Sequence, residues 1–274
     1  MTRFLPFLAL GALVLGGCAA QNSPSTASDP LRGVAASFVA ARAFDRAMGA
    51  LNRDDSAALQ RAGSELRRAA DAGSGLDFTP AFATTLSNAA IRLSALAARA
   101  NRAEKARLLT ESDEKYRAAL AFAPAKNPET ELDAATLNAL GYFLADRGQG
   151  RADFERAAQL TKAAYEKWPL QSGPLGVPPQ VDRALQPQDS YAWSLFKLGR
   201  VSEARKQQQE ALKIARQIAP DAISPEIPFH FAEILRAAGE TDRARREYTD
   251  ALQRKPNAEL RAKIDAGLKA LPVS

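Results

Sequence analysis

Histidine and cysteine are almost absent from this sequence, whose 274 residues contain one of each and only two methionines. Protein zinc sites take several Cys or His ligands, so this scarcity leaves no cluster of that kind. One cysteine also excludes an intramolecular disulfide and a CxxC redox pair. The lone histidine, His230, precedes the apolar pair Phe231 and Ala232, a position that favours packing within a helix over service as a base. We therefore expect no metal, no cofactor, no catalytic residue and no enzymatic activity.

Charge of one sign is not concentrated in any part of the chain. The 37 basic and 31 acidic residues give a net charge of +6, and they alternate along the predicted helices as on solvated helix faces. Without a basic stretch, nucleic acid is not an expected partner. Tyrosine and tryptophan are also few, because five Tyr and two Trp stand against 58 alanines. That bias favours helix over sheet.

The only long apolar run covers residues 4–15, after the single basic residue Arg3. It is too short to span a bilayer and fits the hydrophobic segment of an export signal.

The run ends in Leu-Gly-Gly-Cys at residues 15–18, which resembles the lipobox of bacterial lipoproteins. The resemblance implies cleavage after residue 17 and a diacylated Cys18 that anchors the chain to a membrane. A free or buried thiol at Cys18 and an uncleaved anchor helix are the alternatives. Ala19 rather than Asp follows the cysteine, so the expected location is the cell envelope, at the periplasmic face of the outer membrane.

From residue 31 onward, apolar residues recur every three to four positions, and Gly or Pro interrupts them at the intervals of helix hairpins. The clearest unit contains Ala232, Ala244, Tyr248, Ala251 and Pro256, at steps of twelve, four, three and five. These steps resemble the packing pattern of the tetratricopeptide repeat (TPR). In that pattern small residues let two helices approach closely, the aromatic fills the gap to the next hairpin, and Pro ends the second helix. The resemblance implies an all-α, right-handed superhelical solenoid of antiparallel helix hairpins.

Two earlier units follow the same steps with two departures each. The second helix of one runs past the expected stop to Pro220, the other has extra residues in its inter-helix turn, and both lack the packing aromatic. Gln208 replaces the packing aromatic in the unit that begins near Tyr191, and Thr161 replaces it in the unit that begins near Leu140. Further upstream we expect a degenerate hairpin with a first helix near residues 82–99, and before it a pair at residues 31–51 and 56–72.

The chain is thus divided into five predicted parts. These are a signal peptide (residues 1–17), the lipidated Cys with a flexible tether (18–30), degenerate hairpins (31–124), TPR repeats (125–256) and a capping helix (257–274). Within the repeats, residues 169–187 contain five prolines and predict a stiff, partly polyproline II insertion. That insertion is either a passive surface loop, which the pattern favours, or a lid over the binding groove or a docking strand for a partner.

TPR proteins usually bind an extended or helical peptide in a concave groove lined by the first helix of each hairpin. Carried over by alignment on the small residues, this groove would present Asn138, Tyr142, Asp146, Asp189, Trp193, Phe196, Lys197, Phe229, Glu233 and Arg236. We select Tyr142, Asp189, Trp193, Phe196, Phe229, Glu233 and Arg236 as candidate partner-binding residues, because aromatic and Arg side chains most often contribute interface energy. For Trp193 and Tyr142 the alternative is plain packing between hairpins.

Together these features predict a lipid-anchored adaptor or scaffold of the cell envelope. It would hold protein or peptide partners in the concave face and contact the membrane through the lipid on Cys18. Three alternatives stay open: a structural component of an envelope assembly for pili, outer-membrane proteins or polysaccharide export, a regulator that activates an envelope enzyme in trans, and a glycan binder that stacks sugars on Trp193.

Overall fold

A computed structural model describes residues 30–52, 58, 61, 64–66, 68, 79–98, 100–123, 128–168 and 178–272. These residues form helices and no strand. The helices are α1 (Pro30–Asn52), α3 (Thr79–Ala97), α4 (Arg102–Phe122), α5 (Pro128–Glu131), α6 (Ala134–Arg147), α7 (Arg151–Lys167), α8 (Pro179–Arg183), the π-helical η1 (Ala184–Gln188), α9 (Asp189–Lys197), α10 (Val201–Ile218), the 3₁₀ turn η2 (Pro220–Ala222), α11 (Glu226–Ala237), α12 (Thr241–Gln253) and α13 (Ala258–Lys269).

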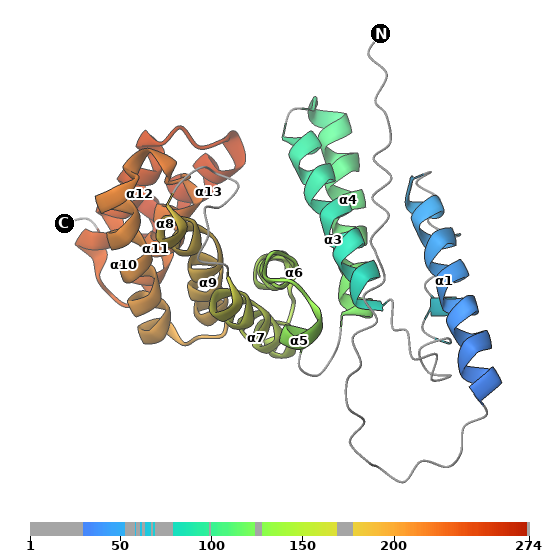
Figure 1. The fold of residues 1–274 in the computed structure, drawn as a ribbon. Coiled ribbons are helices and arrows are strands. Elements are labelled where there is room, and N and C mark those ends of the chain that lie inside the picture. Colours follow the sequence, from blue (N-terminus) through green and yellow to red (C-terminus); the bar gives the residue numbers. More distant parts are fainter. Residues whose placement is uncertain are drawn as a thin grey trace, which may run out of the picture.

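The described helices stack as antiparallel hairpins, which confirms the expected all-α, TPR-like solenoid. The pairs are α3 with α4, α6 with α7, α9 with α10, and α11 with α12, and the first helix of one pair packs on the first helix of the next. Figure 1 shows these pairs following one another along the molecule, and α13 packs on the last pair, α11 and α12. The expected closing helix is therefore present.

Short polar and glycine signals set the ends of these helices. Asn101, Asp133 and Asn257 each accept a hydrogen bond from a backbone N–H in the first turn of α4, α6 and α13, as N-cap side chains do. The turns after α9 and α11 contain Gly199 and Gly239 with φ of 84° and 77°, a conformation that glycine adopts without steric cost. The tight turns fold α10 and α12 back onto their partners.

The last repeat packs as the TPR pattern predicts. Ala232, Ala244 and Ala251 are fully buried between α11 and α12, and Tyr248 is buried with them. Tyr248 fills the space towards α13 so closely that a Cβ atom added at Gly267 would lie 2.5 Å from the Tyr248 hydroxyl oxygen. Gly267 therefore allows the closing helix to lie against the aromatic ring.

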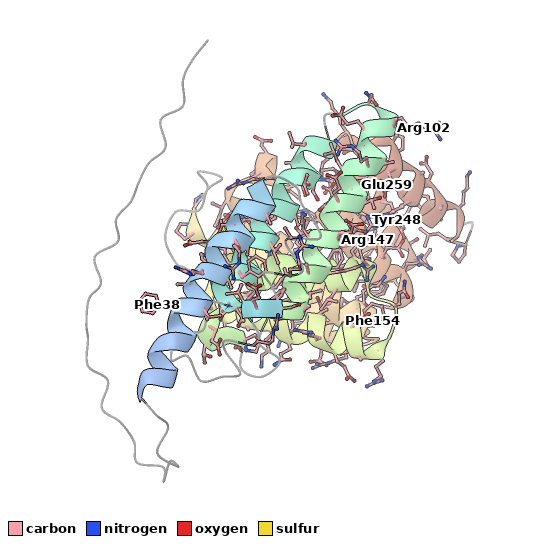
Figure 2. The ribbon with its side chains drawn as sticks, turned by 90° about the vertical axis from the view of Figure 1, so that its right-hand side faces the viewer. Phe38, Arg102, Arg147, Phe154, Tyr248 and Glu259 are labelled. Carbon is pink, nitrogen blue, oxygen red and sulfur yellow. The ribbon has the colours of Figure 1, made fainter. Side chains whose placement is uncertain are left out.

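The N-terminal helix α1 buries an alanine stripe, Ala40, Ala43, Ala47 and Ala50. Phe38 lies on the opposite side and is 69% exposed, and Figure 2 shows its side chain directed away from the helix. The helix agrees with the expected one at residues 31–51. Its partner at residues 56–72 lies mostly outside the described residues, although positions 64–66 are helical.

The Pro-rich insertion is shorter than predicted. Residues 169–177 lie outside the described residues, but Pro179 begins α8, which continues through η1 into α9. The prediction of a partly polyproline II segment reaching Pro187 was therefore wrong for residues 179–187. Pro179 occupies the helix start, where its missing N–H has no intrahelical partner to lose. Pro187 lies inside the π-helical turn, a local widening of the helix that accommodates its ring.

Candidate functional site

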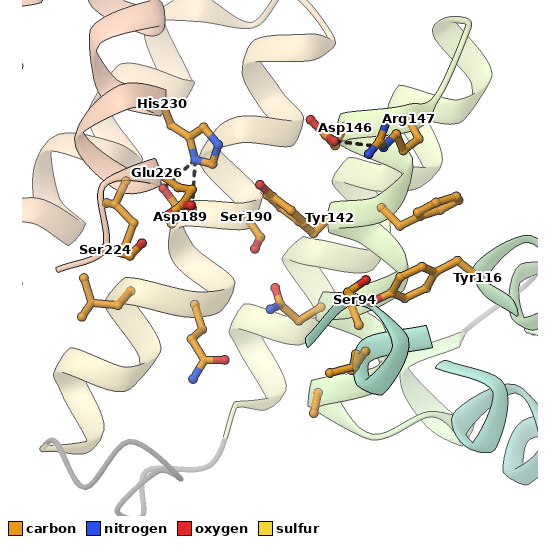
Figure 3. A pocket seen from close by; sticks show the side chains of 18 of the residues that line it. Ser94, Tyr116, Tyr142, Asp146, Arg147, Asp189, Ser190, Ser224, Glu226 and His230 are labelled. Atoms are coloured by element: carbon orange, nitrogen blue, oxygen red, sulfur yellow. Dashed lines mark hydrogen bonds and ion pairs between the residues drawn. The ribbon is translucent and has the colours of Figure 1, made fainter. Parts of the chain in front are cut away.

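A cavity of about 550 Å³ opens where the first helices of four successive hairpins meet. We call it the groove cavity. Its lining comes from α3, α4, α6, η1, α9 and α11, with the turn before α11 and the residue after α7 (Figure 3): Ile91, Ser94, Leu109, Asp113, Tyr116, Ala135, Asn138, Ala139, Tyr142, Phe143, Asp146, Arg147, Trp168, Leu185, Gln186, Asp189, Ser190, Ser224, Glu226, Ile227 and His230. The stacking of the hairpins positions these side chains. The first helix of each hairpin packs on the first helix of the next, and one face of each of these helices is left directed towards the groove cavity.

Carboxylates dominate the charge of the groove cavity. Asp113, Asp146, Asp189 and Glu226 line it, and Arg147 is its only Lys or Arg. This acidic lining contrasts with the net charge of +6 on the whole chain.

Aromatic rings form part of the same wall. Tyr116 and Phe143 stack with their centroids 4.8 Å apart, and Tyr142 lies with its centroid 6.0 Å from that of His230. Burial, followed by the nearby charge of Asp113, raises the pKa of Tyr116 to about 12. The Tyr116 hydroxyl therefore remains protonated and neutral at physiological pH.

The hydroxyl of Tyr142 lies in the field of several carboxylates. Burial is the largest cause that raises its pKa, and Asp146, Asp189 and Glu226 raise it further, whereas Arg147 lowers it. These three carboxylates line the same cavity as the Tyr142 hydroxyl. Figure 3 shows Tyr142 pointing from α6 towards the side chains of α9 and α11.

A buried polar network supports the floor of the cavity. Asp189 accepts hydrogen bonds from His230 Nδ1 at 3.1 Å and from Gln208 Nε2 at 2.6 Å. The three side chains come from α9, α11 and α10, and His230 also stacks on Trp193 with centroids 4.2 Å apart. Asp189, His230 and Gln208 are at most 6% exposed. The glutamine that replaces the repeat's packing aromatic thus serves as a hydrogen-bond donor inside the array.

The predicted groove residues divide between the cavity and the interior. Asn138, Tyr142, Asp146 and Asp189 line the groove cavity as expected. Trp193 and Phe229 are only 7% and 8% exposed.

For Trp193 the structure has the packing arrangement that was the alternative interpretation. Its ring lies between His230 and Phe196, which removes the sugar-stacking surface on which a glycan-binding function depended.

The remaining predicted residues lie away from the groove cavity. Glu233 accepts a hydrogen bond from Tyr248 and pairs with Arg236 at 2.7 Å, so this part of α11 is engaged within its own hairpin. The amine of Lys197 lies 5.5 Å from the centroid of the Trp193 ring.

Several cavity residues were not predicted from the sequence. His230, assigned to packing, is indeed buried, and it also lines the cavity. Glu226 and Ser190 lie one helical turn or less from predicted positions, and a wider helix face would have included them. Tyr116 and Asp113 come from α4, a second helix, which the rule of first helices excludes.

Other kinds of site receive no support from the part of the chain that the structure describes. It contains no group of three His, Cys, Asp or Glu side chains placed to hold a metal ion. None of its helices is long and apolar enough to cross a membrane. Cys18 and the rest of the predicted signal and tether lie outside the described residues.

Comparison with known proteins gives only distant likenesses. No protein-family model matches the chain, and no curated protein matches it. Two similar solved structures are a thermophilic TPR protein of Thermus thermophilus and PilF of Pseudomonas aeruginosa, each 17% identical to this chain. The first superposes with a TM-score of 0.40, over 84% of this chain and 99% of the other; the second does so with 0.37, over 86% and 90%.

Proposed function

We propose that this chain is a non-enzymatic adaptor of the cell envelope that binds a segment of a partner protein in the groove cavity. The single observation that supports the proposal is the cavity itself. Four successive hairpins converge on it, and it combines aromatic walls with four carboxylates and a single arginine. Concave sites with a few polar groups among apolar side chains are the usual form of binding sites.

The groove proposal predicts a position-dependent crosslink in cells. A photoreactive amino acid at Ser224, an exposed cavity residue, is expected to capture a discrete partner. The same probe at Gln209, exposed on α10, serves as the control position. Ala135→Trp fills the cavity from an exposed position and should reduce the Ser224 adduct about tenfold, because a bulky ring excludes the partner.

The matched control is Ala262→Trp, an equal change at an exposed position of α13, which should leave the adduct unchanged. Immunoblots of the irradiated cells give both results. Equal capture at Ser224 and Gln209, or a Ser224 adduct that persists in Ala135→Trp, would contradict binding in the groove cavity.

The envelope location rests on the lipobox-like sequence at residues 15–18 and predicts the effect of Cys18→Ser. Without the thiol no thioether to a diacylglycerol forms, so the chain should accumulate as an uncleaved precursor or leave the membrane fraction. Two acyl chains hold a protein durably at a membrane, at about 0.8 kcal/mol per buried CH₂. Fractionation and intact-mass measurement, with Ser28→Ala as the control, test this. Membrane attachment that is the same in Cys18→Ser would refute the lipid anchor.

A further inference from the structure

We infer that the groove cavity selects partner segments that carry a basic side chain, which it holds between Glu226, Asp146 and Tyr142. This inference rests on the proposed function and names the chemistry of the segment that is bound. The occupant is a peptide segment with an arginine or lysine.

Free carboxylates are the first observation behind this choice. Within the described part of the chain, Glu226 and Asp113 make no hydrogen bond or ion pair, although both line the cavity. Asp146 pairs only with its neighbour Arg147, at 3.3 Å between side chains that are 35% and 46% exposed. Such exposed pairs are worth little and exchange readily. The cavity therefore offers negative charge that the fold does not use.

A second, independent observation comes from His230. Its side chain is 3% exposed, and its Nδ1 bonds to Asp189. A carboxylate only accepts hydrogen bonds, so Nδ1 carries a hydrogen and donates it to Asp189. No described residue bonds to Nε2, and Figure 3 shows this nitrogen on the side of the ring that faces Tyr142. This ring nitrogen of a buried side chain is therefore left for a polar group of a ligand in the cavity.

The aromatic walls fit the same ligand. A cation is attracted to the face of an aromatic ring within about 6 Å of its centroid, and Tyr116, Tyr142 and Phe143 all line the cavity. A guanidinium group stacks on such rings and bonds a carboxylate through two parallel N–H groups, which an ammonium cannot do. Arginine should therefore bind more tightly than lysine.

Anionic segments are disfavoured by the same arrangement. Glu226, Asp113 and Asp146 would repel a carboxylate or phosphate, and Arg147 alone is available to attract one. Charge of the wrong sign in a partly enclosed site is an effective means of rejecting a competitor.

The test is selection of a random linear peptide library on the purified full chain, followed by titration of one selected peptide. We expect arginine, and less often lysine, to be enriched at one position of the peptides whose binding Ala135→Trp abolishes. The double variant Glu226→Gln/Asp146→Asn should weaken binding of the selected peptide about tenfold or more, because hydrogen bonds to charged groups are stronger than those between neutral groups. Glu210→Gln/Asp242→Asn, the same charge change at exposed residues of α10 and α12, should have no effect.

A thermodynamic cycle identifies the contact. Replacing the peptide's arginine by glutamine should also cost about tenfold, but only about twofold in the Glu226→Gln/Asp146→Asn background, because partners in one interaction are not additive. Additive losses would overturn the inference. Peptides that bind in the cavity without a basic residue would overturn it too and leave the proposed function intact. If no selected peptide is sensitive to Ala135→Trp, the proposed function itself fails.

Discussion

Asp189→Ala is expected to lower the free energy of unfolding by about 3 kcal/mol, one of the two largest losses we predict. The substitution removes the acceptor for His230 Nδ1 and for Gln208 Nε2. Both donors are at most 3% exposed, so water cannot replace the lost carboxylate without opening the array. Gln208 already has a side-chain oxygen without a partner. The variant would therefore leave a cluster of unpaired polar groups between three helices.

The measurement is urea denaturation followed by helical circular dichroism, and Asp146→Ala is the matched control. Asp146 is on the same cavity but is 35% exposed and bonds only to Arg147. Its loss should therefore cost less than about 1 kcal/mol. Asp189→Asn keeps the shape and one acceptor oxygen, and should fall between the two. Equal midpoints for Asp189→Ala and Asp146→Ala would show that the network contributes nothing to stability.

The sequence predicts the repeat packing well because that packing follows local spacing. Steps between small residues locate Ala232, Ala244 and Tyr248 in the interior, where the structure has them. These positions depend only on helix periodicity and on the close approach of two consecutive helices. The same logic placed Asn138, Tyr142 and Asp146 on the groove side of α6.

Contacts between different hairpins were harder to predict. Trp193 lies on the correct face of α9, but His230 from the next hairpin stacks on it and buries it. Helix periodicity predicts the direction in which a side chain points, but it does not predict whether residues of another hairpin cover that side chain. Gln208 occupies the packing position of its repeat. A polar residue fits there because its side chain donates a hydrogen bond to Asp189 of the neighbouring helix. The contribution of α4 to the cavity depends on how the α3–α4 hairpin is inclined, which no local pattern specifies.

The other large loss is predicted for Gly141, where α6 packs tightly against Ala157 and Thr161 of α7. Gly141→Val should lower the free energy of unfolding by about 3 kcal/mol. A Cβ atom at residue 141 would lie 2.6 Å from Thr161 Cγ2, 3.0 Å from the Thr161 nitrogen and 3.1 Å from the Ala157 oxygen. The first neighbour is a methyl group, but the other two are backbone atoms of α7. Removing this steric overlap therefore requires α6 and α7 to move apart, and this disturbs the α6 residues that line the groove cavity.

A second substitution separates the methyl contact from the backbone contacts. Thr161→Ser removes Cγ2 but keeps the hydroxyl that bonds to the Ala157 oxygen at 2.8 Å. It should recover about 1 kcal/mol of the loss in Gly141→Val and leave the remainder, because the backbone of α7 stays in place. Gly150→Val is the control, since a Cβ atom there meets no atom within 4 Å, and it should cost less than about 1 kcal/mol. The urea midpoints of Gly141→Val, Thr161→Ser, their double variant and Gly150→Val decide between the explanations. A full rescue by Thr161→Ser would assign the clash to the methyl group alone, whereas equal losses in Gly141→Val and Gly150→Val would mean that α6 and α7 are not held at this separation.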